Sequence, residues 1–193
     1  MCGSLPGKNY NLLFERAADQ YGFVTAKDAR ELDIHEKRLA EMRARGVLER
    51  RARGLYRFPA IPPTGYEQLM EATLWPRRAR GILSHATALD VHDLCDVNPA
   101  KIDITVPAGY RVNRDVPAVY AIHHRDLEPT EVTLYEGIPI VTPLRAIKDG
   151  IEVDLGPHLL EQAIETARRR GRIRKRDLPE LEQLLGRPLG ASA

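Results

Sequence analysis

The sequence has few cysteines and no long apolar run. Cys2 and Cys95 are its only cysteines among 193 residues, too few for a disulfide framework or for a zinc module built on paired CxxC motifs. We expect both to be free thiols. No run of about 18 apolar residues occurs, and the N-terminal stretch MCGSLPGKNY lacks the apolar core of a signal peptide. The sequence therefore predicts neither a membrane span nor export, and we expect a cytoplasmic protein.

Motifs of the common enzyme classes are also missing. The sequence contains neither a GxxxxGK[ST] nor a GxGxxG phosphate loop. His85 and His92 are seven residues apart, with Cys95 three further on, but this spacing matches no strict metal-binding motif. Ser84 next to His85 lacks the glycine elbow of a hydrolase serine. We predict no catalysis, cofactor or metal. A nuclease or hydrolase is the alternative, and its activity would depend on His85, His92 or His123. The sequence assigns no role to His124.

Charge is distributed unevenly along the chain. The net charge is only +2, yet residues 1–58 hold 12 Lys and Arg against 8 Asp and Glu, residues 59–167 hold 9 against 16, and residues 168–193 hold 8 against 3. The chain is thus basic, then acidic, then basic. Basic surfaces attract polyanions, because neutralising phosphates releases counterions, so the two basic segments indicate nucleic acid as a candidate partner. Solvated helix faces that happen to be rich in arginine are the alternative.

The first basic segment carries the signals of three short helices. A helix is expected over residues 11–20, and an extended pair follows at residues 23–24. Thr25 is a suitable N-cap for a short second helix, because Asp28 stands three positions on and complements the helix start. A third helix is expected over residues 35–45, closed by a glycine at its C-terminus. A short helix, a tight turn and a second helix with a basic outer face are typical of a helix-turn-helix.

A β-hairpin is expected directly after this helix pair. Residues 47–50 and 55–58 alternate as strands, and Gly54 allows the arginine-rich tip RARG to turn. We expect the tip arginines to lie outside the core, because nothing in a loop of that length could pair and bury them. The whole segment is therefore predicted to be a winged helix-turn-helix that binds DNA, with protein docking as the alternative use of the fold. The predicted DNA-binding residues are His35, Lys37, Arg38, Glu41, Arg45, Arg50, Arg51 and Arg53.

A proline-rich stretch follows the hairpin and suggests a domain boundary. PAIPPTG, residues 59–65, interrupts both helix and strand, so we predict a DNA-binding domain at 1–58, a linker at 59–65 and a C-terminal domain at 66–193. In the last of these, Ser84 is expected to cap a helix over residues 83–94, three or four strands should follow, and Pro143 should open another helix after Thr142. The predicted class is α+β, with a winged helix-turn-helix followed by a mixed α/β domain.

The second dense basic feature is the run RRRGRIRKR at residues 168–176. Its single apolar residue, Ile173, could anchor the run to the core and present the basic groups on one surface. Nucleic acid or the acidic surface of a partner protein would suit these groups, and a solvated helix junction is the alternative. The basic residues are Arg168, Arg169, Arg170, Arg172, Arg174, Lys175 and Arg176.

The order of these stretches resembles the AbiEi-type antitoxins of bacterial toxin–antitoxin systems. The resemblance runs over about residues 8–186 and lies in the ordered set: GVLERRARGLYRFP, then ILSHATALDVHDL after the prolines, then strands such as IDITVP, then GIPIVTPLRAIKDG. LSHATALDVH and TPLRAIKD are its most specific parts, and the MenA antitoxins of mycobacteria look particularly similar.

This resemblance implies a transcriptional repressor of its own operon. The N-terminal domain would bind double-stranded DNA at inverted repeats in the promoter, and the C-terminal domain would counter a toxin of the nucleotidyltransferase type, either by contact or functionally. The sequence leaves one further function open, a winged-helix repressor that responds to a ligand and has no toxin partner.

Overall fold

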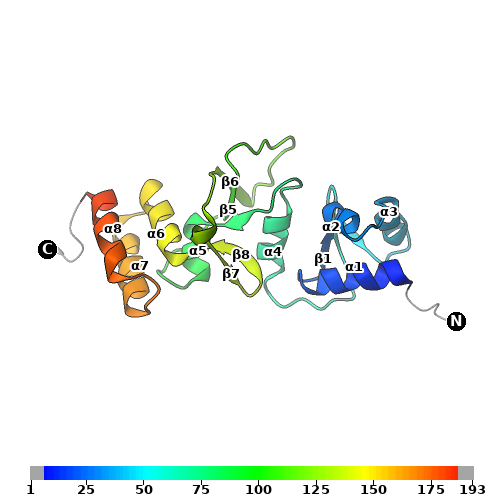
Figure 1. Cartoon of the computed structure of the whole chain (residues 1–193), viewed down its shortest axis with the longest axis horizontal. Helices are drawn as coiled ribbons and strands as arrows, with labels where there is room; N and C mark the ends of the chain where they lie inside the picture. Colours follow the sequence, from blue (N-terminus) through cyan, green and yellow to red (C-terminus); the bar gives the residue numbers. More distant parts are fainter. Residues whose placement is uncertain (1–6, 187–193) are drawn as a thin grey trace. The chain divides into compact units, whose positions relative to one another are not determined.

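The computed structural model describes residues 7–186. Helices and short strands alternate along the chain (Figure 1), which confirms the predicted α+β class. The chain divides into two compact units, Met1–Arg80 and Gly81–Ala193, and each has its own sheet. Every helix within residues 7–186 is too short or too polar to span a membrane.

The N-terminal unit combines helices with a small antiparallel sheet. Its elements are α1 (Lys8–Ala18), β1 (Phe23–Thr25), α2 (Ala26–Glu31), α3 (Lys37–Ala44), β2 (Glu49–Ala52), β3 (Leu55–Arg57) and α4 (Glu67–Leu74). The sheet order is β1-β3-β2, so β3 is central, and Val24 and Arg50 both lie opposite Tyr56. The second hairpin strand matches its prediction closely, whereas β2 is shifted toward the turn because its pairing with β3 sets its limits.

Local side-chain chemistry fixes the ends of the short helices. Thr25 Oγ1 accepts a hydrogen bond from the backbone N–H of Asp28 at 3.0 Å, and Asp28 Oδ2 accepts from the Thr25 N–H at 2.7 Å. This reciprocal capping box satisfies two N–H groups that the helix itself cannot. Gly46 follows α3 with a φ of +74°, a left-handed conformation that favours glycine. Both features agree with the expectation from the sequence.

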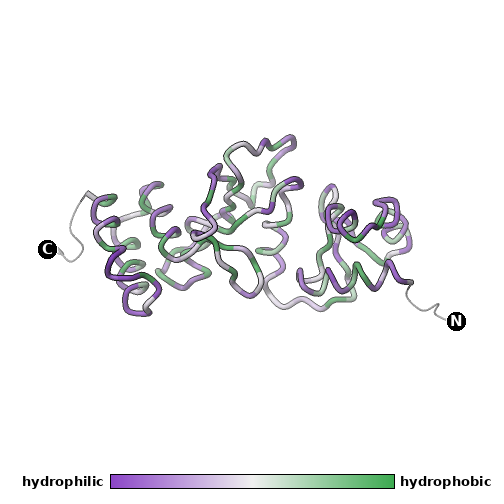
Figure 2. Tube along the Cα trace, viewed as in Figure 1, coloured by the Kyte–Doolittle hydropathy of each residue, from purple (hydrophilic) through white to green (hydrophobic). Residues whose placement is uncertain are grey.

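Apolar side chains of α1, β1 and α3 close the core of this unit. Leu13, Val24, Leu39 and Phe58 are fully buried, and the Phe58 ring makes edge contacts with two aromatic rings of α1. Burying side chains of this size stabilises a fold by about 1.5–3 kcal/mol each. Hydrophilic and hydrophobic residues alternate along the helices (Figure 2), as expected for helices with one face on a core.

Helix α4 belongs to the N-terminal unit although it follows the proline-rich stretch. Met70 on α4 is fully buried, and Arg80 Nη1 donates to Gln20 Oε1 at 2.8 Å. The boundary between the compact units therefore falls after Arg80, downstream of the predicted linker at 59–65. Prolines interrupt regular structure there, but the chain returns to the same core.

The C-terminal unit is a mixed sheet with helices. Its elements are β4 (Ile82–Leu83), α5 (His85–Val91), β5 (Ile102–Val106), β6 (Tyr120–His124), the 3₁₀ turn η1 (Pro129–Glu131), β7 (Val132–Tyr135), β8 (Ile138–Val141), α6 (Pro143–Glu152), α7 (Pro157–Arg169), the 3₁₀ turn η2 (Lys175–Asp177) and α8 (Leu178–Leu185). The sheet order is β6-β5-β4-β8-β7. Strands β5 and β6 are parallel, as are β4 and β8, while the β4–β5 and β7–β8 pairs are antiparallel.

Two predicted helix starts in this unit have different outcomes. Thr142 Oγ1 accepts from the N–H of Arg145 at 3.4 Å, and Pro143 opens α6, as expected. Ser84 occupies the N-cap position of α5 but makes no capping hydrogen bond. The Ser84 side chain is fully buried, and its hydroxyl oxygen accepts a hydrogen bond from Thr105 Oγ1 at 2.8 Å. Ser84 is therefore the N-cap residue, as predicted, but its hydroxyl contacts a strand neighbour and leaves the helix N–H groups uncapped.

Candidate nucleic-acid interface

Helix α3 keeps nearly all of its side chains at the surface. Leu39 is its single fully buried residue, so one narrow face packs on the core. Arg38 Nη1 donates to Glu41 Oε2 at 2.7 Å, and this hydrogen bond lowers the pKa of the Glu41 carboxyl. A contact between Arg38 and another acceptor would compete with this surface pair. The predicted DNA-binding residues of this region are all exposed except half-buried Glu41, and they are His35, Lys37, Arg38, Glu41 and Arg45.

The turn of the β2–β3 hairpin is fixed to the start of α2. The carbonyl oxygen of Gly54 accepts a hydrogen bond from the Ala26 N–H at 2.9 Å. Gly54 has a φ of +76°, which a residue with a Cβ adopts only with strain. Arg50 and Arg53, on either side of the hairpin tip, are exposed. The sequence prediction of exposed arginines is confirmed for these two.

Arg51 differs from its neighbours because it has a partner within the chain. Its guanidinium lies 3.1 Å from the carboxylate of Glu71 on α4, and its Nε also donates to that carboxylate. The pairing of β2 with β3 is irregular between Arg50 and Ala52, so Arg51 is an extra residue in the register of β2. Arg51 is exposed, as expected for a tip arginine, but its partner Glu71 comes from beyond the predicted domain boundary.

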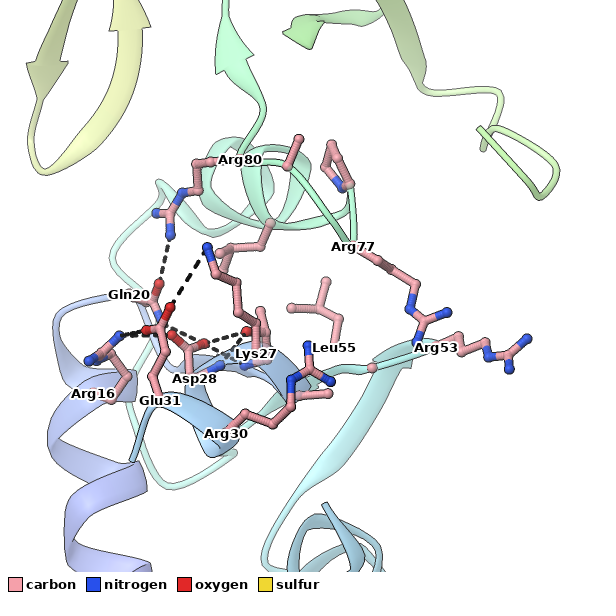
Figure 3. A pocket seen from close by; sticks show the side chains of 16 residues that line it. Arg16, Gln20, Lys27, Asp28, Arg30, Glu31, Arg53, Leu55, Arg77 and Arg80 are labelled. Carbon is pink, nitrogen blue, oxygen red and sulfur yellow. Dashed lines mark hydrogen bonds and ion pairs between the residues drawn. The ribbon is translucent and has the colours of Figure 1, made fainter. Parts of the chain in front are cut away.

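A further group of basic side chains surrounds a polar pocket beside the hairpin turn (Figure 3). The pocket has a volume of about 140 Å³, and α2, the hairpin turn and residues 74–80 contribute to its walls. Its basic residues are Arg16, Lys27, Arg30, Arg53, Arg77 and Arg80. Of these, the sequence analysis had singled out only Arg53. The run RRAR at 77–80 was a visible signal, but it lies within the segment that is acidic as a whole.

The C-terminal basic run lies on the surface of the other unit. Its seven Arg and Lys side chains are exposed, whereas Ile173 is buried and anchors the run, as expected. Arg170 is held in place, since its guanidinium donates to the carbonyl oxygen of Asp93 at 2.7 Å and to the Asp93 carboxylate at 2.6 Å. Arg168 pairs with Glu165 at 2.8 Å on the exposed face of α7. Most of the run therefore remains available to an anionic partner.

The two stretches that carry the family resemblance meet inside the C-terminal unit. LSHATALDVH supplies α5 and TPLRAIKD supplies α6, and the two helices pack together. Buried Arg145 donates through Nε to Asp149 Oδ1 at 2.9 Å and through Nη2 to Glu152 Oε1 at 2.6 Å. Burial raises the pKa of Asp149, although the Arg145 charge opposes this shift. These contacts form a polar network along α6 in which Arg145 and Asp149 are buried.

His85 lies beside this network and has an unusual backbone conformation and a lowered pKa. It begins α5 with a φ of +52°, which is uncommon for a non-glycine residue. Its ring stacks on that of His123 with centroids 3.5 Å apart, and its Nδ1 lies 3.8 Å from Asp149 Oδ2. Burial, reinforced by His123, lowers the pKa of His85 to about 4. His123 Nε2 is in turn 2.8 Å from Asp103 Oδ1.

Ser84 Oγ lies 2.9 Å from His85 Nδ1, whereas the remaining residues considered for catalysis or metal binding contact other groups. His92 Nε2 donates to the carbonyl oxygen of Val141 at 2.8 Å, and burial lowers its pKa. His124 is exposed. Cys95 is a buried free thiol whose pKa is raised by burial, while Cys2 lies outside the described residues. Within residues 7–186, no three His, Cys, Asp or Glu side chains are grouped so that they could hold a metal ion.

Comparison with known proteins identifies the N-terminal segment. Residues 11–59 match the family model of the AbiEi antitoxin transcriptional regulators. The crystal structure of the Rv2827c protein from Mycobacterium tuberculosis has a similar fold, with a TM-score of 0.52 at 17% sequence identity over 94% of this chain and 73% of that one. No curated protein matches the sequence significantly. The resemblance to the AbiEi-type antitoxins is thus confirmed over residues 11–59, where the family model matches.

Proposed function

We propose that the N-terminal unit is a winged helix-turn-helix that binds double-stranded DNA. In this proposal α2 and α3 form the helix-turn-helix, α3 is the recognition helix, and the β2–β3 hairpin is the wing. The order of elements and the antiparallel β1-β3-β2 sheet support it, as does the match to a family of transcriptional regulators. Recognition helices lie in the major groove and read base edges through their N-terminal residues.

The observation that carries the proposal is the exposure of α3. A helix that buries only Leu39 and presents Lys37 and Arg38 in its first turn contributes little to the core. Such a helix is suited to entering a groove, where Arg38 can form two hydrogen bonds with a guanine. Arg50 and Arg53 of the hairpin would contact flanking phosphates or the minor groove.

Substitution of Arg38 tests this assignment. Arg38→Ala should reduce discrimination by about 1–3 kcal/mol at one base position, because a bidentate contact to guanine would be lost. Arg43→Ala removes an exposed charge from the last turn of the same helix and serves as the matched control. Fluorescence polarisation with operator variants measures both proteins. An equal loss on specific and random duplexes would mean that Arg38 contacts phosphate only, and would refute its role in reading sequence.

The biological role that fits this interface is repression of the protein's own operon in the cytoplasm. The family match supports an antitoxin-type regulator, and binding to inverted repeats in the promoter is the finer statement that we propose. A repeat read by two copies would place recognition helices one helical turn of DNA apart, or a multiple of it. DNase footprinting on the promoter tests this spacing.

We further propose that the C-terminal unit opposes a toxin of the nucleotidyltransferase type, by contact or by countering its effect. The exposed basic run at 168–176 is the surface that we assign to this task, because buried Ile173 holds it on the unit and four of its seven basic residues make no ion pair within the described residues. These four are Arg169, Arg172, Arg174 and Lys175. Seven cations within nine positions are suited to nucleic acid or to an acidic protein surface.

A pair of full-length variants separates the two roles. Because Arg170 is bonded to Asp93, the first variant keeps it and replaces the other six basic residues of the run by glutamine. This variant should lose rescue of growth against the cognate toxin and retain operator binding. The second variant, Arg50→Gln with Arg53→Gln, should show the reverse. If the first variant still rescues growth, the basic run has no antitoxic role.

A further inference from the structure

Arg77 and Arg78 are positioned to extend the DNA-binding surface beyond the segment that matches the regulator family. Both side chains are exposed, and neither makes an ion pair within residues 7–186. They follow α4, outside residues 11–59. Two neighbouring arginines that are exposed and make no ion pair are ordinary on a protein surface. The residues that surround them carry the argument.

Arg77 lies against the hairpin turn. Its Nε is 3.5 Å from the position that a Cβ on Gly54 would occupy, and Figure 3 shows Arg53 and Arg77 extending side by side at the rim of the pocket. The Gly54 carbonyl also accepts a hydrogen bond from the Ala26 N–H, which joins the turn to the start of α2, and Arg77 lies beside this turn. A second hollow next to the pocket is lined by Arg77, Arg78 and three residues of α2, which are Lys27, Arg30 and Glu31.

The acidic groups of this region are already bound to other side chains. Asp28 accepts hydrogen bonds from Thr25, Gln20 and Arg16. Glu31 pairs with Arg16 at 3.1 Å and with Lys27 at 3.7 Å. Arg53, Arg77 and Arg78 therefore have no carboxylate to neutralise them within the described residues. The rim carries a local excess of positive charge, and an anion is the ligand that it fits.

We infer that Arg53, Arg77 and Arg78 bind successive phosphates of one DNA strand next to the groove that α3 enters. Three features favour a duplex backbone over a small anion. Arg53 and Arg77 extend along the rim of the pocket (Figure 3), and Arg78 lines the neighbouring hollow. All three are exposed, and the hollow is shared with α2, the helix that crosses the DNA backbone in a helix-turn-helix. The planar guanidinium forms paired hydrogen bonds with phosphate oxygens. This inference rests on the proposed binding of α3 to DNA.

The test uses full-length Arg77→Gln/Arg78→Gln and, as control, Lys101→Gln/Arg111→Gln, which removes two exposed cations from the C-terminal unit. Binding to operator and random duplexes is measured over a range of salt concentrations. Each lost phosphate contact lowers the slope of log K against log salt by about 0.9, so the slope should fall by about 1.8 in the test variant on both duplexes. Discrimination between the duplexes should not change. The control should retain the wild-type slope.

The outcomes separate this inference from the proposal beneath it. Suppose that wild-type protein binds and that Arg38→Ala loses discrimination. An unchanged salt slope in Arg77→Gln/Arg78→Gln would then show that these two arginines do not contact phosphates, which overturns the inference, while α3 would remain the interface. An equal fall in slope for test and control also overturns it, since the effect would then be one of net charge. Wild-type protein that binds no duplex overturns both. Thermal denaturation of the two double variants verifies that each is folded.

Discussion

The His85 cluster predicts that the stability of the C-terminal unit depends on pH. His85 is buried, stacked on His123 and close to Asp149, and it is neutral in the folded protein because its pKa is lowered from 6.5 to about 4. The unfolded chain has no such restraint. Protons therefore bind preferentially to the unfolded state wherever the pH lies between these two values.

The sign and size of the effect follow from this shift. Above pH 6.5 the imidazole is neutral in both states and contributes no pH dependence. As the pH falls toward 4, the unfolded state gains a proton that the folded state does not, and stability is lost at up to about 1.4 kcal/mol per pH unit. Between pH 7.5 and 4.5 the loss from His85 alone should reach about 2.5 kcal/mol. Burial also lowers the pKa of His92 and raises the pKa of Asp149, so these groups add a pH dependence of their own.

A difference measurement isolates His85 from those groups. We suggest His85→Asn, because asparagine tolerates the left-handed backbone at this position, with exposed His158→Gln as control. Urea denaturation followed by circular dichroism gives the free energy of unfolding at each pH. The stability advantage of wild type over His85→Asn should shrink by about 2.5 kcal/mol from pH 7.5 to 4.5, and the control should show no such change. An advantage that stays constant over this range would refute the assignment of a neutral, buried His85.

Three further changes have defined expectations from the packing. Arg145→Met leaves Asp149 buried without its cation and should cost about 3–5 kcal/mol in urea denaturation, while adding Asp149→Leu should recover much of it; no recovery would contradict a buried pair. Thr25→Ala removes the α2 cap and should cost about 1–2 kcal/mol, and an unchanged urea midpoint would contradict that. Gly54→Ala should cost roughly 1–2 kcal/mol through its positive φ, and should lower the melting temperature measurably.

Features that depend on near neighbours were predictable from the sequence. The capping box at Thr25, the proline start of α6 and the glycine after α3 each need only a few adjacent residues to form. The exposure of Arg38, Arg50 and Arg53 was predictable for a similar reason, since charged residues are rarely buried without a partner.

Features that depend on distant contacts were not predictable. Glu71 pairs with Arg51 from 20 positions away, and Thr105 takes the hydroxyl of Ser84 from 21 positions away. Helix α4 returns to the N-terminal core after the prolines, which no local pattern indicates. Strand β4 has only two residues, too few for an alternating pattern. The arginine rim was missed because its members come from the hairpin and from residues 77–78, which only the fold brings together.

The most direct test of the account is a comparison of two duplexes. One carries the inverted repeat from the promoter of the protein's own operon, and the other has the same composition in scrambled order. Full-length protein should bind the repeat at least about a thousand-fold more tightly at physiological salt, and Arg38→Ala should reduce that ratio. Equal affinity for the two duplexes, or binding to neither, would contradict the conclusion that this unit is a sequence-specific repressor domain.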